Sequence, residues 1–160
     1  MKQHKCILLI YTGGTIGMKK SNDGSLQPFD FTSLTQNIPE LNKFDLTLNA
    51  ISFQRPIDSS NVSPDVWIKI ARIIKTQYNK HDGFIVLHGS DTMAYTASAL
   101  SFLLEGLNKP VILTGSQLPI GARRTDAKEN LITSIEIAAS QKIPEVSVYF
   151  ESKLLRGNRT

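Results

Sequence analysis

The chain has 160 residues, of which 41% are hydrophobic and 20% charged, which is the balance of a folded globular protein and excludes a disordered one. Its net charge of +4 is modest. The basic residues gather at Arg123–Arg124 and from Lys153 to Arg159 with no aromatic residues among them, which argues against a nucleic-acid partner. No apolar stretch approaches the roughly 20 residues that a membrane span requires, so no membrane partner is expected.

The single cysteine, Cys6, allows no disulfide within one chain, which favours a reduced, cytoplasmic setting. Because Cys6 lies inside the first apolar run, we interpret it as a small core residue rather than a reactive thiol. The chain start carries lysines, but no small-residue cleavage site follows the apolar run, so no export signal is predicted.

Apolar runs without a helical period predict five strands, namely Cys6–Tyr11, Leu46–Phe53, Gly83–Leu87, Val111–Thr114 and Val146–Phe150. The second run alternates at Leu46, Leu48 and Ala50, which predicts one exposed face. The other runs are apolar throughout, as parallel strands buried on both faces are.

Three helices are expected between these strands. The first begins at Ser63, where a capping hydroxyl, a first-turn proline and an acid follow one another, and it buries Trp67, Ile70, Ala71 and Ile74. The second runs from about Thr92 to Leu104, is apolar nearly all round and is expected to be deeply packed. The third begins near Asp126 and ends before Pro144.

The alternation of strands and helices predicts an α/β domain of the Rossmann or flavodoxin-like kind, layered, with a mostly parallel sheet and helices on both faces. In such sheets ligands bind outside the carboxyl ends of the strands, where Thr15, Ser90 and Gly115 fall. The polar segment Met18–Phe31, with a turn signal at 22–24, predicts a hairpin over this site.

Two strand ends share an unusual pattern. The first apolar run leads into Gly13 and Gly14 and then Thr15, and the third leads into His88, Gly89, Ser90 and Asp91. A hydroxyl nucleophile needs a proton acceptor and an oxyanion site. Asp91 could orient the acceptor, and backbone N–H groups at the glycine turns could hold the developing charge. The plainer alternatives are a tight strand-to-helix turn or a phosphate cradle.

A third polar group, Asp58, Ser59 and Ser60, follows the second strand. Two acids, several hydroxyls, the glycine N–H donors and no metal-ligand cluster fit a zwitterion such as an amino acid, and no cofactor is expected. The alternative for Asp58–Ser60 is a loop with local side-chain-to-backbone bonds. Of the histidines, His88 is interpreted as a structural residue without a metal, and His4 and His81 as surface residues.

Five motifs in order along the whole chain resemble the bacterial-type L-asparaginases, and most closely the cytoplasmic type I enzymes: Tyr11–Met18, Asp58–Ser60, His88–Ala97, Leu113–Gln117 and Arg156–Thr160. The resemblance implies hydrolysis of L-asparagine, with L-glutamine open as a second substrate, to L-aspartate and ammonia through an acyl-enzyme on a threonine. Thr15 is then the nucleophile, with Ser90 in place of the family's second active-site threonine, beside Asp91. The residues implied to bind substrate are Asp58, Ser59, Ser60, Gly89 and Ser116, the last through its backbone carbonyl.

Three departures from the family pattern stand out. The hairpin has Ser25 or Leu26 where the family has a tyrosine, and Ala127 replaces a glycine in the run Asp126–Leu131, which we interpret as a structural change. The family's proton-accepting lysine follows the motif that ends here at Thr160. We therefore expect residues 1–160 to be the amino-terminal domain of an asparaginase, without the carboxyl-terminal domain and inactive alone, and the full-length form to be a homo-oligomer.

Two rival functions remain open. Without the tyrosine and the lysine, the chain could be a non-catalytic amino-acid-binding or assembly module. The related subunit that frees ammonia for tRNA-dependent amidation is expected to carry an additional domain before the first strand.

Overall fold

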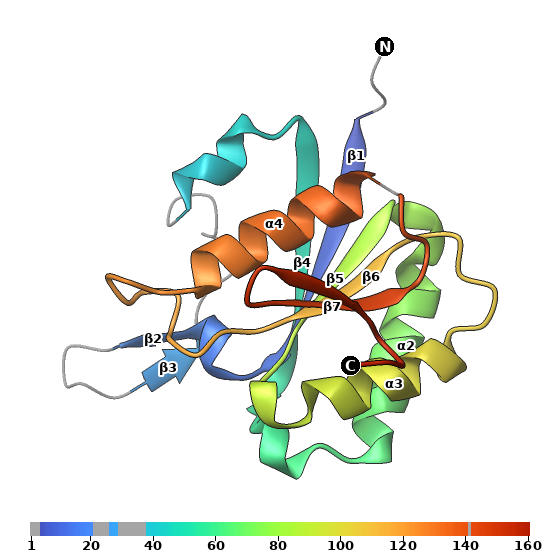
Figure 1. Cartoon of the computed structure of the whole chain (residues 1–160), viewed down its shortest axis with the longest axis horizontal. Coiled ribbons are helices and arrows are strands. Elements are labelled where there is room, and N and C mark those ends of the chain that lie inside the picture. The colour runs from blue at the N-terminus through green and yellow to red at the C-terminus, as the bar shows by residue number, and fades with distance from the viewer. Residues whose placement is uncertain (1–3, 21–25, 29–37, 141) are drawn as a thin grey trace.

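A six-stranded sheet with helices on both faces forms the molecule (Figure 1). The computed structural model describes residues 4–20, 26–28, 38–140 and 142–160. The strands of the sheet are β1 (Lys5–Gly13), β4 (Leu46–Ile57), β5 (Gly83–Leu87), β6 (Val111–Thr114), β7 (Val146–Phe150) and β8 (Lys153–Arg156). They lie in the order β4-β1-β5-β6-β7-β8, and every neighbouring pair is parallel except β7 with β8. The predicted mostly parallel α/β architecture is confirmed.

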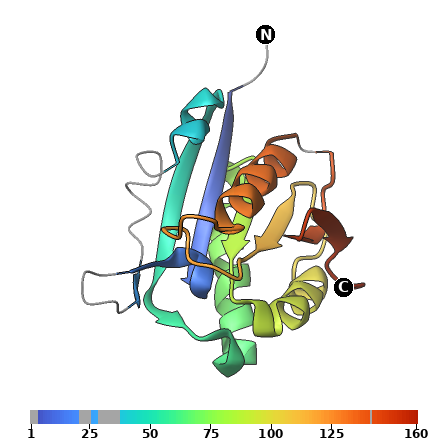
Figure 2. The same ribbon diagram turned by 60° about the vertical axis from the view of Figure 1, so that its left-hand side comes forward.

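Within the described residues, three α-helices cover the sheet: α2 (Pro64–Gln77), α3 (Met93–Leu103) and α4 (Ala127–Ser140). Helix α4 packs on one face, and α2 and α3 pack on the other (Figures 1 and 2). Short 3-10 turns are η1 (Thr15–Gly17), η3 (Pro39–Lys43), η4 (Ser59–Asn61), η5 (Tyr78–Lys80) and η6 (Ser90–Thr92). Three of these turns, η1, η4 and η6, directly follow strands β1, β4 and β5.

The two-sided cover explains why the central strands are apolar throughout. Along β1, Ile7 and Leu9 pack in the cluster under α4, whereas Leu8 and Ile10 pack in the cluster under α2 and α3. All five residues of β5 are buried. Alternate side chains point to opposite faces of a strand, so a strand covered on both sides needs apolar residues at every position.

The strand order reverses its direction between β1 and β5. These two strands are neighbours, yet β4, which lies between them in the chain, pairs on the far side of β1. The chain therefore leaves β1 toward one edge of the sheet and leaves β5 toward the other. In open α/β sheets ligands bind where this direction reverses, outside the carboxyl ends of the strands, and η1 and η6 directly follow β1 and β5 there.

The edge strand β4 is longer than predicted, and its two halves pack against opposite faces of the sheet's cover. Leu46 and Leu48 pack on the α4 cluster, whereas Ile51 and Phe53 pack on the α2 and α3 cluster. The pairing of β4 with β1 also shifts register between Tyr11 and Gly13. The alternation expected at Leu46 and Leu48 is confirmed, but it does not continue through Ala50, which is exposed.

The structure corrects the expected packing of the second helix. Met93, Ala97 and Leu100 are buried as predicted, but Tyr95 and Phe102 are 67% and 69% exposed. Apolar residues on all sides of a helix predict burial only if another element covers each side, and among the described residues the sheet and α2 leave Tyr95 and Phe102 of α3 uncovered. The expected deep packing of this helix therefore holds for its inner face only.

Strand β8 was not predicted, because its sequence contains two basic residues and only two leucines. It forms a hairpin with β7 through Glu151 and Ser152, which have φ angles of 48° and 58°. Two-residue turns with positive φ match the twist of paired strands. No Gly or Asn marks this turn, so the sequence lacked the usual hairpin signal.

His81 is also corrected, because it is 5% exposed rather than on the surface. Its ring nitrogens lie 3.0 Å from Asn49 Nδ2 and 3.1 Å from the Gln77 carbonyl oxygen. These contacts join β4 to the end of α2. A polar sequence neighbourhood suggested exposure, but these tertiary partners satisfy the imidazole in the interior.

The predicted hairpin after η1 is confirmed by antiparallel pairing of β2 (Met18–Lys20) with β3 (Leu26–Pro28). Its expected turn at 22–24, Ser25 and Phe31 lie outside the described residues. Among the helices that are described, none has the length and apolar character needed to cross a bilayer.

Candidate active site

The turns after β1 and β5 touch through their backbones. Gly14 has φ 85° and ψ 167°, a conformation that L side chains rarely adopt. A Cβ atom on Gly14 would lie 2.5 Å from the backbone nitrogen of Gly89 and 2.6 Å from its Cα. Only glycine allows this approach, which puts the turn carrying Thr15 against the turn carrying Ser90 and Asp91.

The loop after β4 joins the same contact. A Cβ atom on Gly89 would collide with the side chain of Ser59, so the loop of Ser59 lies against the turn after β5. The Ser59 hydroxyl donates a hydrogen bond to Asp91 Oδ2 at 3.0 Å, and the Thr92 hydroxyl donates to the Ser59 carbonyl oxygen at 2.7 Å. Ser59 and Asp91 are 32 residues apart in the chain, yet the segments at 58–60 and 89–92 lie side by side.

Thr92 was not singled out from the sequence as a site residue. Its hydroxyl holds the buried Ser59 in place, and Ser59 in turn binds Asp91. The signal that could have found it is its position at the end of the His88–Thr92 motif, where a side-chain hydroxyl before a helix commonly bonds to backbone.

Thr15 begins η1 directly after Gly14 and is partly buried. Tyr11 of β1 supports the turn, because its ring packs against Gly17 and its hydroxyl donates to the Gly14 carbonyl oxygen at 3.4 Å. Burial raises the pKa of Tyr11 to about 12. Tyr11 is therefore a neutral phenol that supports the backbone of the turn.

Asp58 is an exposed residue whose carboxylate is engaged locally. Its Oδ1 atom accepts hydrogen bonds from the Ser60 backbone N–H at 3.0 Å and from the Ser60 hydroxyl at 2.9 Å. These bonds, the backbone one first, lower the pKa of Asp58 from 3.8. Local side-chain bonds of the kind expected of a plain loop are therefore present at Asp58 and Ser60, and they keep a negative charge beside Ser59.

His88 has the structural role that the sequence predicted. Its Nδ1 atom lies 2.7 Å from the Gly89 carbonyl oxygen, so Nδ1 carries the hydrogen, and Nε2 accepts from the Thr96 hydroxyl at 3.0 Å. Thr96 accepts in turn from Trp67 Nε1 at 3.0 Å. Burial lowers the pKa of His88 from 6.5. This neutral chain of hydrogen bonds fixes the peptide that joins Gly89 to Ser90.

Ser116 lies one strand further along the same edge, in the loop after β6. It is 4% exposed, and its hydroxyl donates to the Leu118 carbonyl oxygen at 2.6 Å. Its neighbour Gly115 lies against the His88 carbonyl, which ties this loop to the turn after β5. Asp126, just before helix α4, and Asn130, within it, both form hydrogen bonds to the backbone of this loop.

The structure thus brings the predicted residues to one edge of the sheet, across β4, β1, β5 and β6 in spatial order. Asp58, Ser90 and Asp91 are exposed and Thr15 is partly so, whereas Ser59 and Ser116 are buried. The site is open to one side. Over the described ranges, no three His, Cys, Asp or Glu side chains converge to hold a metal ion.

The family model described as "Asparaginase, N-terminal" matches residues 6–160. The chain belongs to the asparaginase family. L-asparaginase 1 of Escherichia coli strain K12 is 46% identical over 160 residues, which are 99% of this chain and 47% of that protein. The asparaginase chain therefore spans about half the length of the curated relatives it matches.

Solved structures agree with this asparaginase assignment. The crystal structure of L-asparaginase I from Vibrio cholerae is 44% identical with a TM-score of 0.88, over 98% of this chain and 47% of that one. A probable cytoplasmic L-asparaginase from Campylobacter jejuni is 29% identical with a TM-score of 0.78, over 96% of this chain and 46% of that one. The fold and family predicted from the five motifs are confirmed.

Proposed function

We propose that this chain is the amino-terminal domain of a cytoplasmic L-asparaginase that hydrolyses L-asparagine to L-aspartate and ammonia. Family membership supports the reaction class. The observation that carries the site is the backbone contact between Gly14 and Gly89, because it brings the turn of Thr15 beside that of Ser90 and Asp91.

In the proposed reaction the Thr15 hydroxyl oxygen attacks the carbonyl carbon of the substrate side chain. The amide nitrogen takes up a proton and leaves as ammonia, and an ester on Thr15 remains. Water then cleaves the ester, which releases aspartate and restores the hydroxyl. Backbone N–H groups of the glycine turns are suited to stabilise the negative oxygen of each tetrahedral intermediate.

The Thr15 proton needs an acceptor, because almost no hydroxyl is ionised at neutral pH. The resemblance assigns this part to a lysine that follows the Arg156–Thr160 motif in the family. We therefore propose that these 160 residues bind substrate but do not turn it over, and that a second domain in a homo-oligomer completes the site.

Substrate binding follows from the charges at the edge. The carboxylates of Asp58 and Asp91 flank the ammonium group. The Ser60 and Ser59 hydroxyls orient these two carboxylates by donating to them, and the Gly89 N–H faces the substrate carboxylate. The Ser116 carbonyl accepts from the side-chain amide. L-Glutamine has one more methylene group and is the second substrate to compare.

Calorimetric titration of the 160-residue chain with L-asparagine tests the binding step. Ammonia release is measured in the chain joined to a carboxyl-terminal half like that of its relatives. Thr15→Ala should keep asparagine binding within about threefold and lower turnover by about 1,000-fold or more. Thr76→Ala removes a hydroxyl of α2 that bonds to the Ile73 carbonyl, and as the matched control it should change neither. Turnover that survives Thr15→Ala contradicts the proposed nucleophile.

A non-catalytic amino-acid-binding module is the second candidate. It is favoured by one observation, the lack of any tyrosine from Met18 to Leu41 in the hairpin segment. Asparagine binding without ammonia release from the joined, two-domain protein would support this module over the enzyme.

A further inference from the structure

Asp126, the residue directly before helix α4, binds the backbone of the loop after β6. Its Oδ2 atom accepts the Gln117 N–H at 2.9 Å, and its Oδ1 atom accepts the Leu118 N–H at 3.1 Å. Both carboxylate oxygens are thus committed to two successive amides. Charge-assisted bonds of this kind are stronger than neutral ones and fix the orientation of both peptides.

Asn130, in the first turn of α4, binds the other end of the loop. This residue is 3% exposed, and its Nδ2 atom donates to the Gly115 carbonyl oxygen at 2.9 Å and lies 3.4 Å from Asp126 Oδ2. The Asn130 side chain thus links the Gly115 carbonyl to the Asp126 carboxylate, which in turn binds the amides of Gln117 and Leu118. Gly115 itself lies against the His88 carbonyl, so the loop cannot shift toward β5.

The loop end is fixed as well. The hydroxyls of Ser116 and Thr125 both donate to the Leu118 carbonyl oxygen, at 2.6 and 3.0 Å. From Gly115 to Leu118, two carbonyls and two amides are therefore committed to side chains. Such bonding leaves the segment little freedom to change its peptide orientations.

The Ser116 carbonyl oxygen differs from the other acceptors of this segment. Residues in the described ranges donate no hydrogen bond to the Ser116 carbonyl oxygen, although Ser116 is 4% exposed. Carbonyl groups largely withdrawn from water usually have a donor. This carbonyl is held in place by its neighbours and has acceptor capacity for a ligand.

We propose that Asp126 and Asn130 are positioning residues that hold the Ser116 carbonyl as the acceptor for a primary carboxamide. This inference rests on the proposed function, which puts an asparagine side chain at Ser116. The carbonyl favours a ligand that donates an N–H there, and it repels the oxygen of a carboxylate. The clamp from α4 thereby sets the preference for asparagine over aspartate.

Two near-isosteric variants test this clamp in the 160-residue chain. Asp126→Asn removes the charge and presents at most one acceptor oxygen to two amides, and Asn130→Asp removes the donor to Gly115. We expect backbone amide exchange at Gln117 and Leu118 to become about tenfold faster or more. Asparagine affinity should fall about five- to tenfold while aspartate affinity stays within twofold, because only the amide loses its partner.

Ser134→Ala is the matched control, since the buried Ser134 hydroxyl donates to the Asn130 carbonyl oxygen without touching the loop. It should leave loop exchange and the ratio of the two affinities unchanged.

The outcomes separate the two proposals. An unaltered chain that binds neither amino acid overturns the proposed function, and the clamp inference falls with it. If the unaltered chain binds asparagine and both variants keep its asparagine-to-aspartate ratio, only the clamp is wrong. A loss of both affinities by the same factor also overturns the clamp, because it would show a merely structural role.

Discussion

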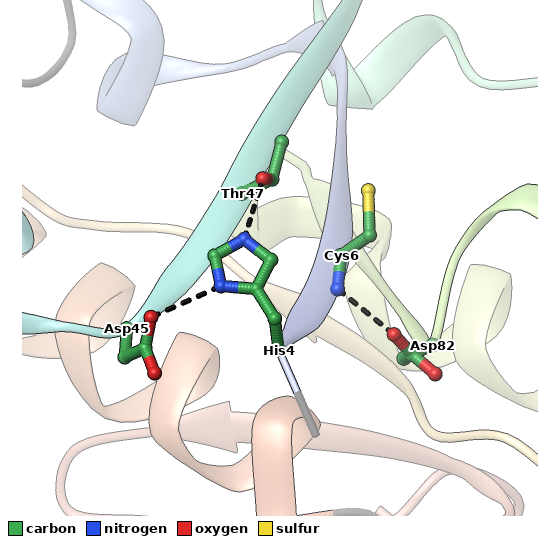
Figure 3. A network of polar contacts seen from close by, with 5 residues as sticks. All are labelled: His4, Cys6, Asp45, Thr47 and Asp82. Carbon is green, nitrogen blue, oxygen red and sulfur yellow. Dashed lines mark hydrogen bonds and ion pairs between the residues drawn. The ribbon is translucent and has the colours of Figure 1, made fainter. Parts of the chain in front are cut away.

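The two edges of the parallel sheet carry the same kinds of side chain in different settings. At the amino edge, the His4 imidazole lies 3.0 Å from Asp45 Oδ1 and 2.8 Å from the Thr47 hydroxyl, and Asp82 accepts the Cys6 N–H at 2.8 Å (Figure 3). At the carboxyl edge, hydroxyls and carboxylates stand on turns held together by glycine contacts.

Residue type does not distinguish the two edges. Thr47, His4 and Asp45 are ordered as a hydroxyl, an imidazole and a carboxylate, the same groups that many hydrolases use. Yet the His4 and Asp45 side chains are 56% and 86% exposed and join the starts of two neighbouring strands. At the carboxyl edge the chain turns sharply after β1 and β5, and the two turns meet through their backbones. The candidate site is therefore distinguished by the placement of its backbone rather than by its residue types.

The largest effect is expected from placing a side chain between the two touching turns, at Gly14. Gly14→Ala puts a Cβ atom 2.5 Å from the Gly89 nitrogen at a φ of 85°, and it should lower the free energy of unfolding by about 3 kcal/mol or more. Gly106→Ala is the matched control, because Gly106 has φ 69° with nothing within 4 Å of its Cβ position. It should lose about 1 kcal/mol. Urea unfolding measures both, and equal losses would show that the turns tolerate separation.

A pair of threonine variants compares the edges directly. Thr92→Val removes the shorter of two hydrogen bonds to the buried Ser59 carbonyl, which keeps the Val62 N–H at 3.3 Å, and it should lower the free energy of unfolding by about 1 kcal/mol. Thr47→Val removes a hydroxyl at the amino edge and should lose at most about 0.5 kcal/mol. Asparagine titration should weaken for Thr92→Val only. Similar weakening in both variants would remove the distinction between the edges.

The buried imidazole predicts a smaller, pH-dependent effect. Burial depresses the pKa of His88 from 6.5, so the unfolded chain binds a proton more readily than the folded one. This contribution to stability is therefore present above pH 6.5 and is lost as the pH falls below that value. Between about pH 7.5 and 5.5 the melting temperature should fall less in His88→Asn, which keeps a donor for Gly89. An unchanged slope in that variant would assign the dependence to other groups.

The smallest effect concerns the exposed carboxylate of Asp58. Because Ser60 donates two hydrogen bonds to it, carbon-detected NMR titration should give a pKa below 3.8. Ser60→Ala removes the hydroxyl donor, keeps the backbone one, and should raise the pKa of Asp58 part of the way back. Any stability that these bonds supply is lost as the pH falls through this lowered value. A value for Asp58 that Ser60→Ala leaves unchanged would show that the hydroxyl bond does not persist in solution.

Predictions from the sequence were correct where the local pattern of residues and the overall fold require the same structure. The central strands needed apolar residues on both faces, and the glycines at 13–14 and 89 marked chain reversals at strand ends. They failed where a distant partner decides the outcome. The environment of His81 depends on Asn49, and β8 depends on pairing with β7 through a turn without glycine.

The candidate site divides in the same way. Thr15, Ser90, Asp91 and Asp58 were visible in the sequence because short side chains after strands and glycines are readily recognised. Thr92, Asp126 and Asn130 act on backbone groups of other segments, and the sequence alone does not indicate which carbonyl or amide a side chain reaches.

The sequence by itself determined the family, the order of strands and helices and the edge of the sheet at which polar groups gather, because each follows from local periodicity and short motifs. Only the tertiary structure decided which turns touch, because a backbone contact such as that between Gly14 and Gly89 depends on the pairing of β1 with β5, in which Tyr11 lies opposite Leu87. That pairing is set by burial on both faces of the sheet, a property of the whole core rather than of either turn.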